Sequence, residues 1–168
     1  MKIKRFLGTL LVVVMTITYS CTSSKNEKSL INKNSLVGTW KLIEYADFDT
    51  LTRKWKNPYG DHPKGYFTYT SSGIVNINVS AEKPLKVSLD SEYTKPLTLG
   101  VVLDNAFGYF GTYTIDTIHS VVTHYVKGGS VIDYIGTDQH RQFIIKGDTL
   151  LIGDPTFNVG KRVLIREE

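Results

Sequence analysis

Four polar side chains fall at positions that alternate with apolar residues, and together they could hold or act on a small molecule. His124 lies between two valines of its own face, so an inward-facing strand would place an imidazole among apolar side chains. Glu44 and Arg141 alternate with apolar neighbours in the same way. With Tyr113 they would form a polar patch in an apolar cavity, which is the usual form of a small-molecule site.

The imidazole of His124 has two interpretations. It could hydrogen-bond a ligand or exchange a proton with it. It could also be a core residue that a neighbouring hydroxyl satisfies, and Tyr113 is a candidate partner. The second interpretation is favoured, because a buried polar group needs a partner whether or not it has a function. An inward Glu44 would likewise need a partner to offset its desolvation.

Motifs for metal binding or for a known type of catalysis do not accompany these residues. The four histidines show no HxH or HxxxH spacing, and the chain has a single cysteine. A Ser-His-Asp order, a Gly-rich phosphate loop and a recognisable pair of catalytic carboxylates are also missing from the sequence. We therefore expect no metal and no cofactor, and we favour a binding role over an enzymatic one.

Eight short runs of alternating polarity must position these side chains, and turn residues bound each of them. The runs span residues 38–48, 65–70, 74–80, 108–116, 120–128, 138–146, 149–154 and 161–168. Short turns join most of them, so neighbours in sequence should pair antiparallel. An up-and-down barrel closes such a sheet without a free edge, and an open sandwich is the alternative. An eight-stranded barrel is either filled by side chains or holds one small ligand.

Two longer connections interrupt the runs. Residues 52–65 are rich in Pro, Gly and Asn, which predicts a loop. Residues 97–106, LTLGVVLDNA, could form one or two turns of helix, although a glycine and two adjacent valines weaken that prediction. The stretch from residue 96 to 106 could cap the open end of a barrel.

The N-terminal 20 residues have the anatomy of a secretory signal. Three basic residues precede the apolar run 6–19, which is too short for a membrane-spanning helix. Cys21 follows at once, and a small residue before a lone cysteine resembles the lipobox of bacterial lipoproteins. This predicts a signal peptide over 1–20, a lipidated cysteine and polar tether over 21–35, and one barrel domain over 36–168. The expected location is the bacterial cell envelope, lipid-anchored and facing the periplasm.

The net charge of +4 depends on that N-terminal segment. Its first 20 residues hold three basic residues and no acidic one, so the rest of the chain has 17 basic against 16 acidic residues. A near-neutral chain without a basic, aromatic-rich patch argues against nucleic acid as a partner. The expected partners are a small hydrophobic molecule and, through Cys21, a membrane.

The motif GTW at residues 38–40 opens the first run and resembles the lipocalin signature. In that superfamily the tryptophan plugs the closed end of the barrel, and a basic residue of the last strand packs over it. The resemblance implies that Trp40 is the plug here. Arg162 and Arg166 lie on one face of the last run, and of the two we favour Arg166 for the cation–π contact.

A closer resemblance is to the bacterial lipocalin-like domain family, and it runs from about residue 36 to the end. Its motifs appear here in order as LVGTWKLIEY, HPKGYFTYTSSG, YFGTYTI, VVTHYV and RQFIIKGDTLLI. The resemblance implies a lipocalin-like barrel with a cavity and says much less about activity.

Three functions remain open from the sequence. A binding protein would hold a small hydrophobic or amphipathic ligand, with Tyr113, His124 and Arg141 at its polar end and Glu44 nearby. An isomerase or cyclase would use His124 or Glu44 as acid–base on a hydrophobic substrate. A filled barrel would serve as an envelope scaffold. The first is favoured, and oligomeric state is not readable from the sequence.

Overall fold

One antiparallel sheet makes up most of residues 35–85 and 98–167, the part of the chain that the computed structural model describes. Its strands are β1 (Gly38–Asp49), β2 (Lys54–Lys56), β3 (Lys64–Tyr69), β4 (Ile74–Ser80), β5 (Ala106–Asp116), β6 (Val121–Gly129), β7 (Asp138–Lys146), β8 (Thr149–Gly153) and β9 (Gly160–Arg166). A helix α1 (Leu99–Asn105) and a 3-10 turn η2 (Ile132–Tyr134) lie between strands. Cys21 and the predicted signal peptide lie outside the described residues.

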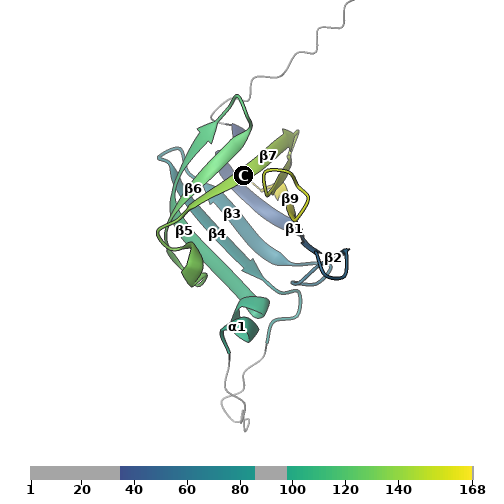
Figure 1. Ribbon diagram of the computed structural model, residues 1–168. Coiled ribbons are helices and arrows are strands. Elements are labelled where there is room, and N and C mark those ends of the chain that lie inside the picture. The colour runs from purple at the N-terminus through teal and green to yellow at the C-terminus, as the bar shows by residue number, and fades with distance from the viewer. Residues whose placement is uncertain (1–34, 86–97, 168) are drawn as a thin grey trace, which may run out of the picture.

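The sheet closes on itself. Strands β3 to β9 each pair with the next one along the chain, and β1 pairs with both β3 and β9. Eight strands therefore form the predicted up-and-down barrel, which leaves no edge for unwanted pairing (Figure 1).

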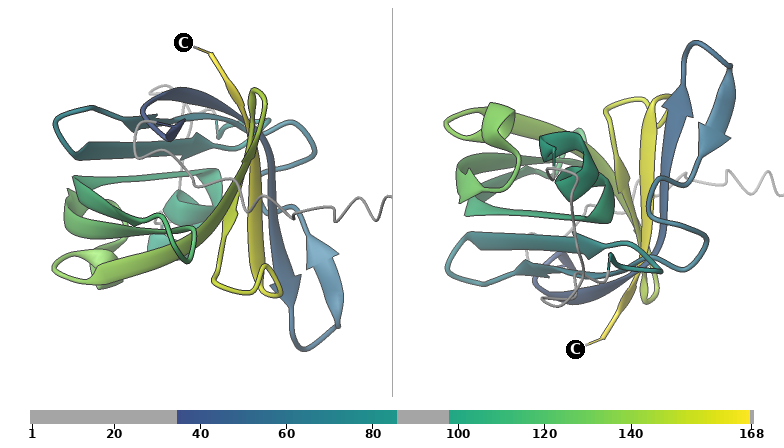
Figure 2. Two further views of the ribbon diagram at one scale, coloured as in Figure 1. Left: turned by 90° about the horizontal axis from the view of Figure 1, so that it is seen from above. Right: turned by 90° about the horizontal axis from the view of Figure 1, so that it is seen from below.

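Strand β2 is the ninth, and among the described strands it pairs with β1 alone. It runs back along the end of β1 and forms a hairpin that projects beyond the barrel (Figure 2). The prediction of a loop over residues 52–65 was wrong for this segment. Three residues carry too little pattern to indicate a strand, and this one exists because β1 is long enough to overhang the barrel.

Alternation places the core as the sequence predicted. In β4, Val75, Ile77 and Val79 are buried while the residues between them face outward. Strand β3 contributes Phe67 and Tyr69 to the same interior. A strand whose side chains point alternately to the two faces needs only this period of two to separate core from surface.

A β-bulge reverses the alternation within β1. Its register against β9 shifts between Leu42 and Glu44, so Tyr45 faces the interior in place of Glu44. The Glu44 carboxylate lies at the surface, with its Oε1 2.8 Å from Nζ of Lys161. The prediction that Glu44 points inward was therefore wrong, because one extra residue reverses the direction of every later side chain in the strand.

Trp40 closes one end of the barrel. It is fully buried, and its Nε1 donates a hydrogen bond of 2.9 Å to the carbonyl of Leu36. The guanidinium of Arg166 lies over the indole ring, with Cζ 4.0 Å from the ring centroid. Its nitrogens donate to the carbonyls of Ser35 and Val37 at 2.6 and 2.9 Å. The predicted contact between Arg166 and Trp40 is thus present.

Helix α1 lies at the opposite end, which confirms the short helix predicted over 97–106 (Figure 1). The Thr98 hydroxyl accepts from the N–H of Val101 and caps the first turn. The Tyr59 hydroxyl donates to the carbonyl of Leu103 at 2.9 Å and ties the helix to the loop after β2. Within the described residues, no helix has the length and apolar character needed to cross a membrane.

Candidate functional site: a cavity at the helix end of the barrel

A cavity of about 370 Å³ occupies the half of the barrel next to α1. Six aromatic residues line it: Tyr45, Tyr59, Phe67, Phe107, Tyr109 and Tyr134. The other half is filled by large buried side chains, among them Trp40, Tyr69, Phe143, Leu150 and Leu164. The barrel is therefore filled at its closed end and hollow at its open end.

The aromatic wall is built from edge-on contacts. The rings of Tyr45 and Tyr59 meet at 4.8 Å between centroids with 79° between their planes, and Phe107 packs against both. Such edge-to-face pairs favour one arrangement of rings over others. Tyr45 comes from β1, Tyr59 from the loop after β2, and Phe107 from β5. Their contacts therefore hold together, around the mouth of the cavity, three segments that are distant in the sequence.

His124 lies at the inner end of the cavity, where β6 directs it inward together with Val122 and Val126. Only 1% of its surface is exposed. Its Nε2 is 3.0 Å from the hydroxyl of Tyr69 and its Nδ1 is 2.9 Å from the hydroxyl of Tyr109. The histidine is thus satisfied by hydroxyls, as the favoured interpretation held, but they belong to these two tyrosines and not to Tyr113.

The electrostatics of this group keep the imidazole neutral. Burial, and then the positive charge of Arg141, lower the pKa of His124 to about 3. Burial also raises the pKa of Tyr109 to about 12 and that of Tyr69 well above its usual value. All three groups are therefore uncharged near neutral pH. An imidazole with both nitrogens engaged and so low a pKa is a poor general base there.

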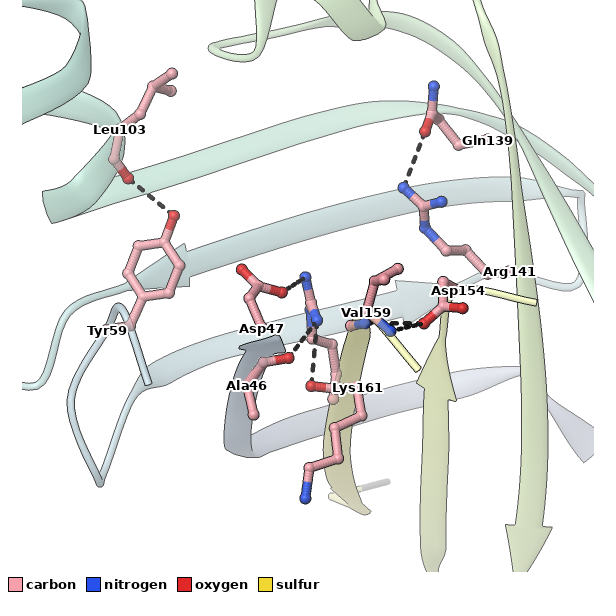
Figure 3. A network of polar contacts seen from close by, with 11 residues as sticks. Ala46, Asp47, Tyr59, Leu103, Gln139, Arg141, Asp154, Val159 and Lys161 are labelled. Atoms are coloured by element: carbon pink, nitrogen blue, oxygen red, sulfur yellow. Dashed lines mark hydrogen bonds and ion pairs between the residues drawn. The ribbon is translucent and has the colours of Figure 1, made fainter. Parts of the chain in front are cut away.

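Arg141 reaches the cavity from β7, on the face it shares with Phe143. One guanidinium nitrogen donates to Oε1 of Gln139 at 2.9 Å and another to the carbonyl of His140 at 3.1 Å (Figure 3). Its Cζ is 5.9 Å from the ring centroid of Tyr134. Within residues 35–85 and 98–167, no carboxylate lies within 4 Å of this guanidinium.

Arg162 carries the second positive charge in the wall, and its charge is compensated. Its Nη2 is 2.9 Å from Oδ1 of Asp47, and its Nη1 donates to the carbonyl of Ala46 at 3.0 Å. The guanidinium stacks on Tyr45 with Cζ 3.4 Å from the ring centroid. Arg162 therefore shapes the rim of the cavity and is held in place by the neighbouring strand β1, whose Ala46 and Asp47 are labelled in Figure 3.

Asp154 holds the loop between β8 and β9, which borders the cavity. Its carboxylate accepts from the N–H groups of Thr156, Val159 and Gly160 and from the Thr156 hydroxyl, at 2.6 to 3.0 Å. Figure 3 shows Asp154 and Val159. Burial alone would raise the pKa of Asp154, but these hydrogen bonds outweigh it and lower the pKa below its usual range. The carboxylate is therefore occupied by its own loop.

The four residues predicted to form the polar patch do not all meet. His124 and Arg141 line the cavity, whereas Glu44 is at the surface. Tyr113 lies on the closed side of His124, where its hydroxyl donates to the carbonyl of Thr70 at 2.8 Å and its ring packs edge-on against Tyr69. Tyr113 does not line the cavity, because it is four residues further along β5 than Tyr109, towards the plugged end.

Several lining residues were missed by the sequence analysis. Tyr45 was not among the predicted site residues, and nothing in the sequence marks the bulge that turns it inward. Tyr59 and Tyr134 lie outside the barrel strands, in a loop and in η2. Their only signal was that they are large aromatic residues in the connections between strands.

The part of the chain that the structure describes has no cluster of metal-binding side chains. Over residues 35–85 and 98–167, no three His, Cys, Asp or Glu side chains gather where they could hold a metal ion. The polar groups that line the cavity are tyrosine hydroxyls, the imidazole of His124, two guanidinium groups and the carboxylates of Asp47 and Asp154. This donor set is suited to hydrogen-bonding an organic ligand.

One family model matches most of this chain. No curated protein matches the sequence. Among solved structures, the chain is similar to a mutant of the fluorescent protein UnaG, at 15% sequence identity, over 80% of this chain and 97% of that one, with a TM-score of 0.37. The family model of the lipocalin-like domain matches residues 37–160, from the first strand of the barrel to the start of the last, and the chain therefore belongs to the lipocalin-like domain family.

Proposed function

We propose that this protein binds a small hydrophobic or amphipathic molecule inside its barrel. The observation that carries the proposal is the hollow half of the barrel, about 370 Å³ and lined in part by six aromatic residues. An eight-stranded barrel that served only as a scaffold would need side chains throughout its interior. Here large side chains fill only the end plugged by Trp40.

The shape and chemistry of the cavity support an amphipathic ligand over a purely polar one. Aromatic and aliphatic side chains share the wall with polar ones, and of these Asp47, Asp154 and Arg162 are engaged by other groups of the protein. His124, Tyr109 and Arg141 lie in the same wall. Cavities of this composition bury the apolar body of a ligand and fix its orientation through a small number of polar contacts. The apolar body would lie against the Tyr45–Tyr59–Phe107 cluster, with the polar end towards Arg141.

A catalytic alternative has less support. It needs an acid–base residue in the cavity, and the two candidates were Glu44 and His124. Glu44 pairs with Lys161 outside the barrel, and both nitrogens of His124 are engaged by tyrosine hydroxyls. The proposal is therefore a binding protein.

The location proposed for this protein is the bacterial cell envelope, with a lipid on Cys21 and the barrel on the periplasmic side. The support is the sequence alone: a basic and apolar leader that ends at a single cysteine, followed by a polar tether. A Cys21→Ser variant should lose metabolic labelling by palmitate and leave the membrane fraction. Continued membrane association of the unlabelled variant would contradict the anchor.

Binding can be tested with N-phenyl-1-naphthylamine, a neutral apolar dye that fluoresces when it leaves water. The protein should take up the dye saturably, and Ile77→Trp should reduce uptake because residue 77 points into the cavity. Ile74→Trp is the matched control, since residue 74 lies on the outer face of the same strand. Circular dichroism confirms that both variants fold. A folded wild-type protein that takes up no dye would refute the proposal.

A further inference from the structure

The Tyr69–His124–Tyr109 chain of hydrogen bonds crosses the barrel from its filled half to its cavity. Tyr69 is fully buried at one end of this chain, and Tyr109 lines the cavity at the other. The imidazole joins them, with 3.0 Å from Nε2 to the Tyr69 oxygen and 2.9 Å from Nδ1 to the Tyr109 oxygen. Which group donates in each of these two hydrogen bonds decides whether Tyr109 can donate a hydrogen bond to a ligand.

Each buried polar group needs a hydrogen-bond partner, and this requirement fixes which groups donate. A neutral imidazole has one donor and one acceptor nitrogen, so one tyrosine must donate to it and the other must accept from it. Within the described residues, the Tyr69 hydroxyl has His124 as its one hydrogen-bond partner. If Tyr69 accepted, its own proton would be buried without an acceptor, which native structures avoid. Tyr69 therefore donates to Nε2.

The remaining protons follow from this assignment. Nδ1 carries the imidazole proton and donates it to the oxygen of Tyr109. The O–H of Tyr109 is then free of the chain, and it belongs to a residue that lines the cavity. This arrangement, the His124 relay, makes the Tyr109 hydroxyl a hydrogen-bond donor that faces the space where a ligand would lie.

Arg141 supplies a second donor in the same region. Both residues pack near the ring of Tyr134, whose centroid is 5.9 Å from Cζ of Arg141 and 5.9 Å from the ring centroid of Tyr109. Among the described side chains, Arg162 is paired with Asp47, and the Asp154 carboxylate accepts hydrogen bonds from N–H groups of its own loop. Arg141 is therefore the cation of the described wall that has no carboxylate within 4 Å.

We propose that the cavity selects amphiphiles with a carboxylate head, one oxygen accepting from the Arg141 guanidinium and the other from the Tyr109 O–H. A carboxylate is acceptor-only and planar, and so it matches two donors that face the cavity from β5 and β7, the two strands that flank β6. The neutral His124 relay keeps the Tyr109 proton available, and the guanidinium compensates the ligand's charge. This inference rests on the proposed binding function and names the class of ligand for the same cavity.

The test compares decanoic acid with decanol and methyl decanoate as competitors of N-phenyl-1-naphthylamine on the full-length protein. These competitors share an apolar chain and differ in the head. Decanoate should displace the dye at least about tenfold more effectively than either neutral competitor, because its head makes charge-assisted hydrogen bonds. Equal potency of acid and alcohol would overturn the inference while the dye binding itself still upheld the proposed function. Absence of dye binding would refute both.

Two substitutions assign the preference to the named residues. Arg141→Gln should bring the ratio of acid to alcohol potency close to one, whereas Lys146→Gln, which removes an exposed charge from the same strand, should leave the ratio unchanged. Tyr109→Phe should weaken decanoate by about tenfold relative to decanol, because the ring remains and only the hydroxyl is lost. Tyr113→Phe is its control, since that hydroxyl lies outside the cavity. An unchanged preference in Arg141→Gln would overturn the inference.

The position of the proton on the His124 ring can be measured directly. In a histidine-labelled sample, nitrogen NMR distinguishes a protonated ring nitrogen from a bare one. The His124 ring is recognisable as the imidazole whose signals do not move between neutral and mildly acidic pH. Its Nδ1 should carry the proton and its Nε2 should not. The opposite tautomer would mean that Tyr109 donates to His124, and the proposed donor to the ligand would be lost.

Discussion

Arg162 and Arg166 point into the barrel from one face of β9, yet they serve opposite ends of it. Each lies across from an aromatic residue of β1 in the strand register, Tyr45 for Arg162 and Trp40 for Arg166. Each guanidinium stacks on that ring, at 3.4 and 4.0 Å from the centroid. The pairing of β1 with β9 closes the barrel, so these two stacks reinforce the seam where the first and last strands meet.

Replacing Arg166 should cost more stability than breaking an ion pair at the surface. Arg166→Ala removes the stack on Trp40 and two hydrogen bonds to backbone carbonyls. We expect the free energy of unfolding in urea to fall by about 2–4 kcal/mol. Lys161→Ala, which loses a half-exposed pair with Glu44, should lose no more than about 1 kcal/mol. Similar losses in the two variants would contradict the role of Arg166 in the closed end.

Stability should depend on pH through His124. Its pKa is about 3 in the folded chain against about 6.5 unfolded, so between these values the unfolded chain binds a proton that the folded chain does not. Stability is therefore full above pH about 6.5 and falls as the pH is lowered. The expected loss is about 2 kcal/mol between pH 6.5 and 4.5, measured by urea unfolding.

A variant without the imidazole should lack this pH dependence. His124→Gln removes the titrating group, and its unfolding free energy should stay nearly constant over the same range, whatever its absolute value. His140→Gln is the control, because that ring is exposed on the outer face and contacts the Thr123 hydroxyl. An unchanged slope in His124→Gln would show that another group is responsible.

Glu44→Gln should have little effect on stability and none on dye binding. The carboxylate is outside the barrel and pairs with Lys161, whose own side chain is partly exposed. We expect a change of less than about 1 kcal/mol in the free energy of unfolding and no change in dye affinity. A marked effect on dye binding would mean that the bulge in β1 does not exist in solution and that the simple alternation of the sequence holds.

Asp154→Ala should loosen one wall of the cavity. The substitution removes the acceptor for three backbone N–H groups and one hydroxyl of the β8–β9 loop. The expected loss is about 1–3 kcal/mol of stability, with faster hydrogen exchange at Val159 and Gly160 and weaker dye binding. Asp133→Ala, at an exposed position, should change none of these. Slow exchange that persists in Asp154→Ala would argue against this role.

The strands and their inward faces were largely predictable from the sequence. A period of two is a local property, so Val75, Ile77 and Val79 could be assigned to the core, and so could His124. The same holds for the GTW motif and for Arg166, because alternation along the last strand leaves few candidates for the contact with Trp40. Short turns between successive runs then indicate an antiparallel barrel.

The partners of these residues required the folded chain. The bulge that turns Tyr45 inward and Glu44 outward depends on pairing with β9, more than a hundred residues away. The choice of Tyr69 and Tyr109 over Tyr113 as partners of His124 depends on how far along β5 each side chain lies from the plug. Sequence alternation gives the face of a side chain but not its height in the barrel.

The sequence by itself thus determined the fold class, the core faces and the presence of a buried histidine, because these follow from local periodicity and turn chemistry. Only the tertiary structure decided that one half of the barrel is hollow, that Arg141 has no carboxylate within 4 Å among the described residues, and that His124 lies between two tyrosines. Those properties depend on the volumes and distances between side chains of different strands, and no single segment of the chain contains that information.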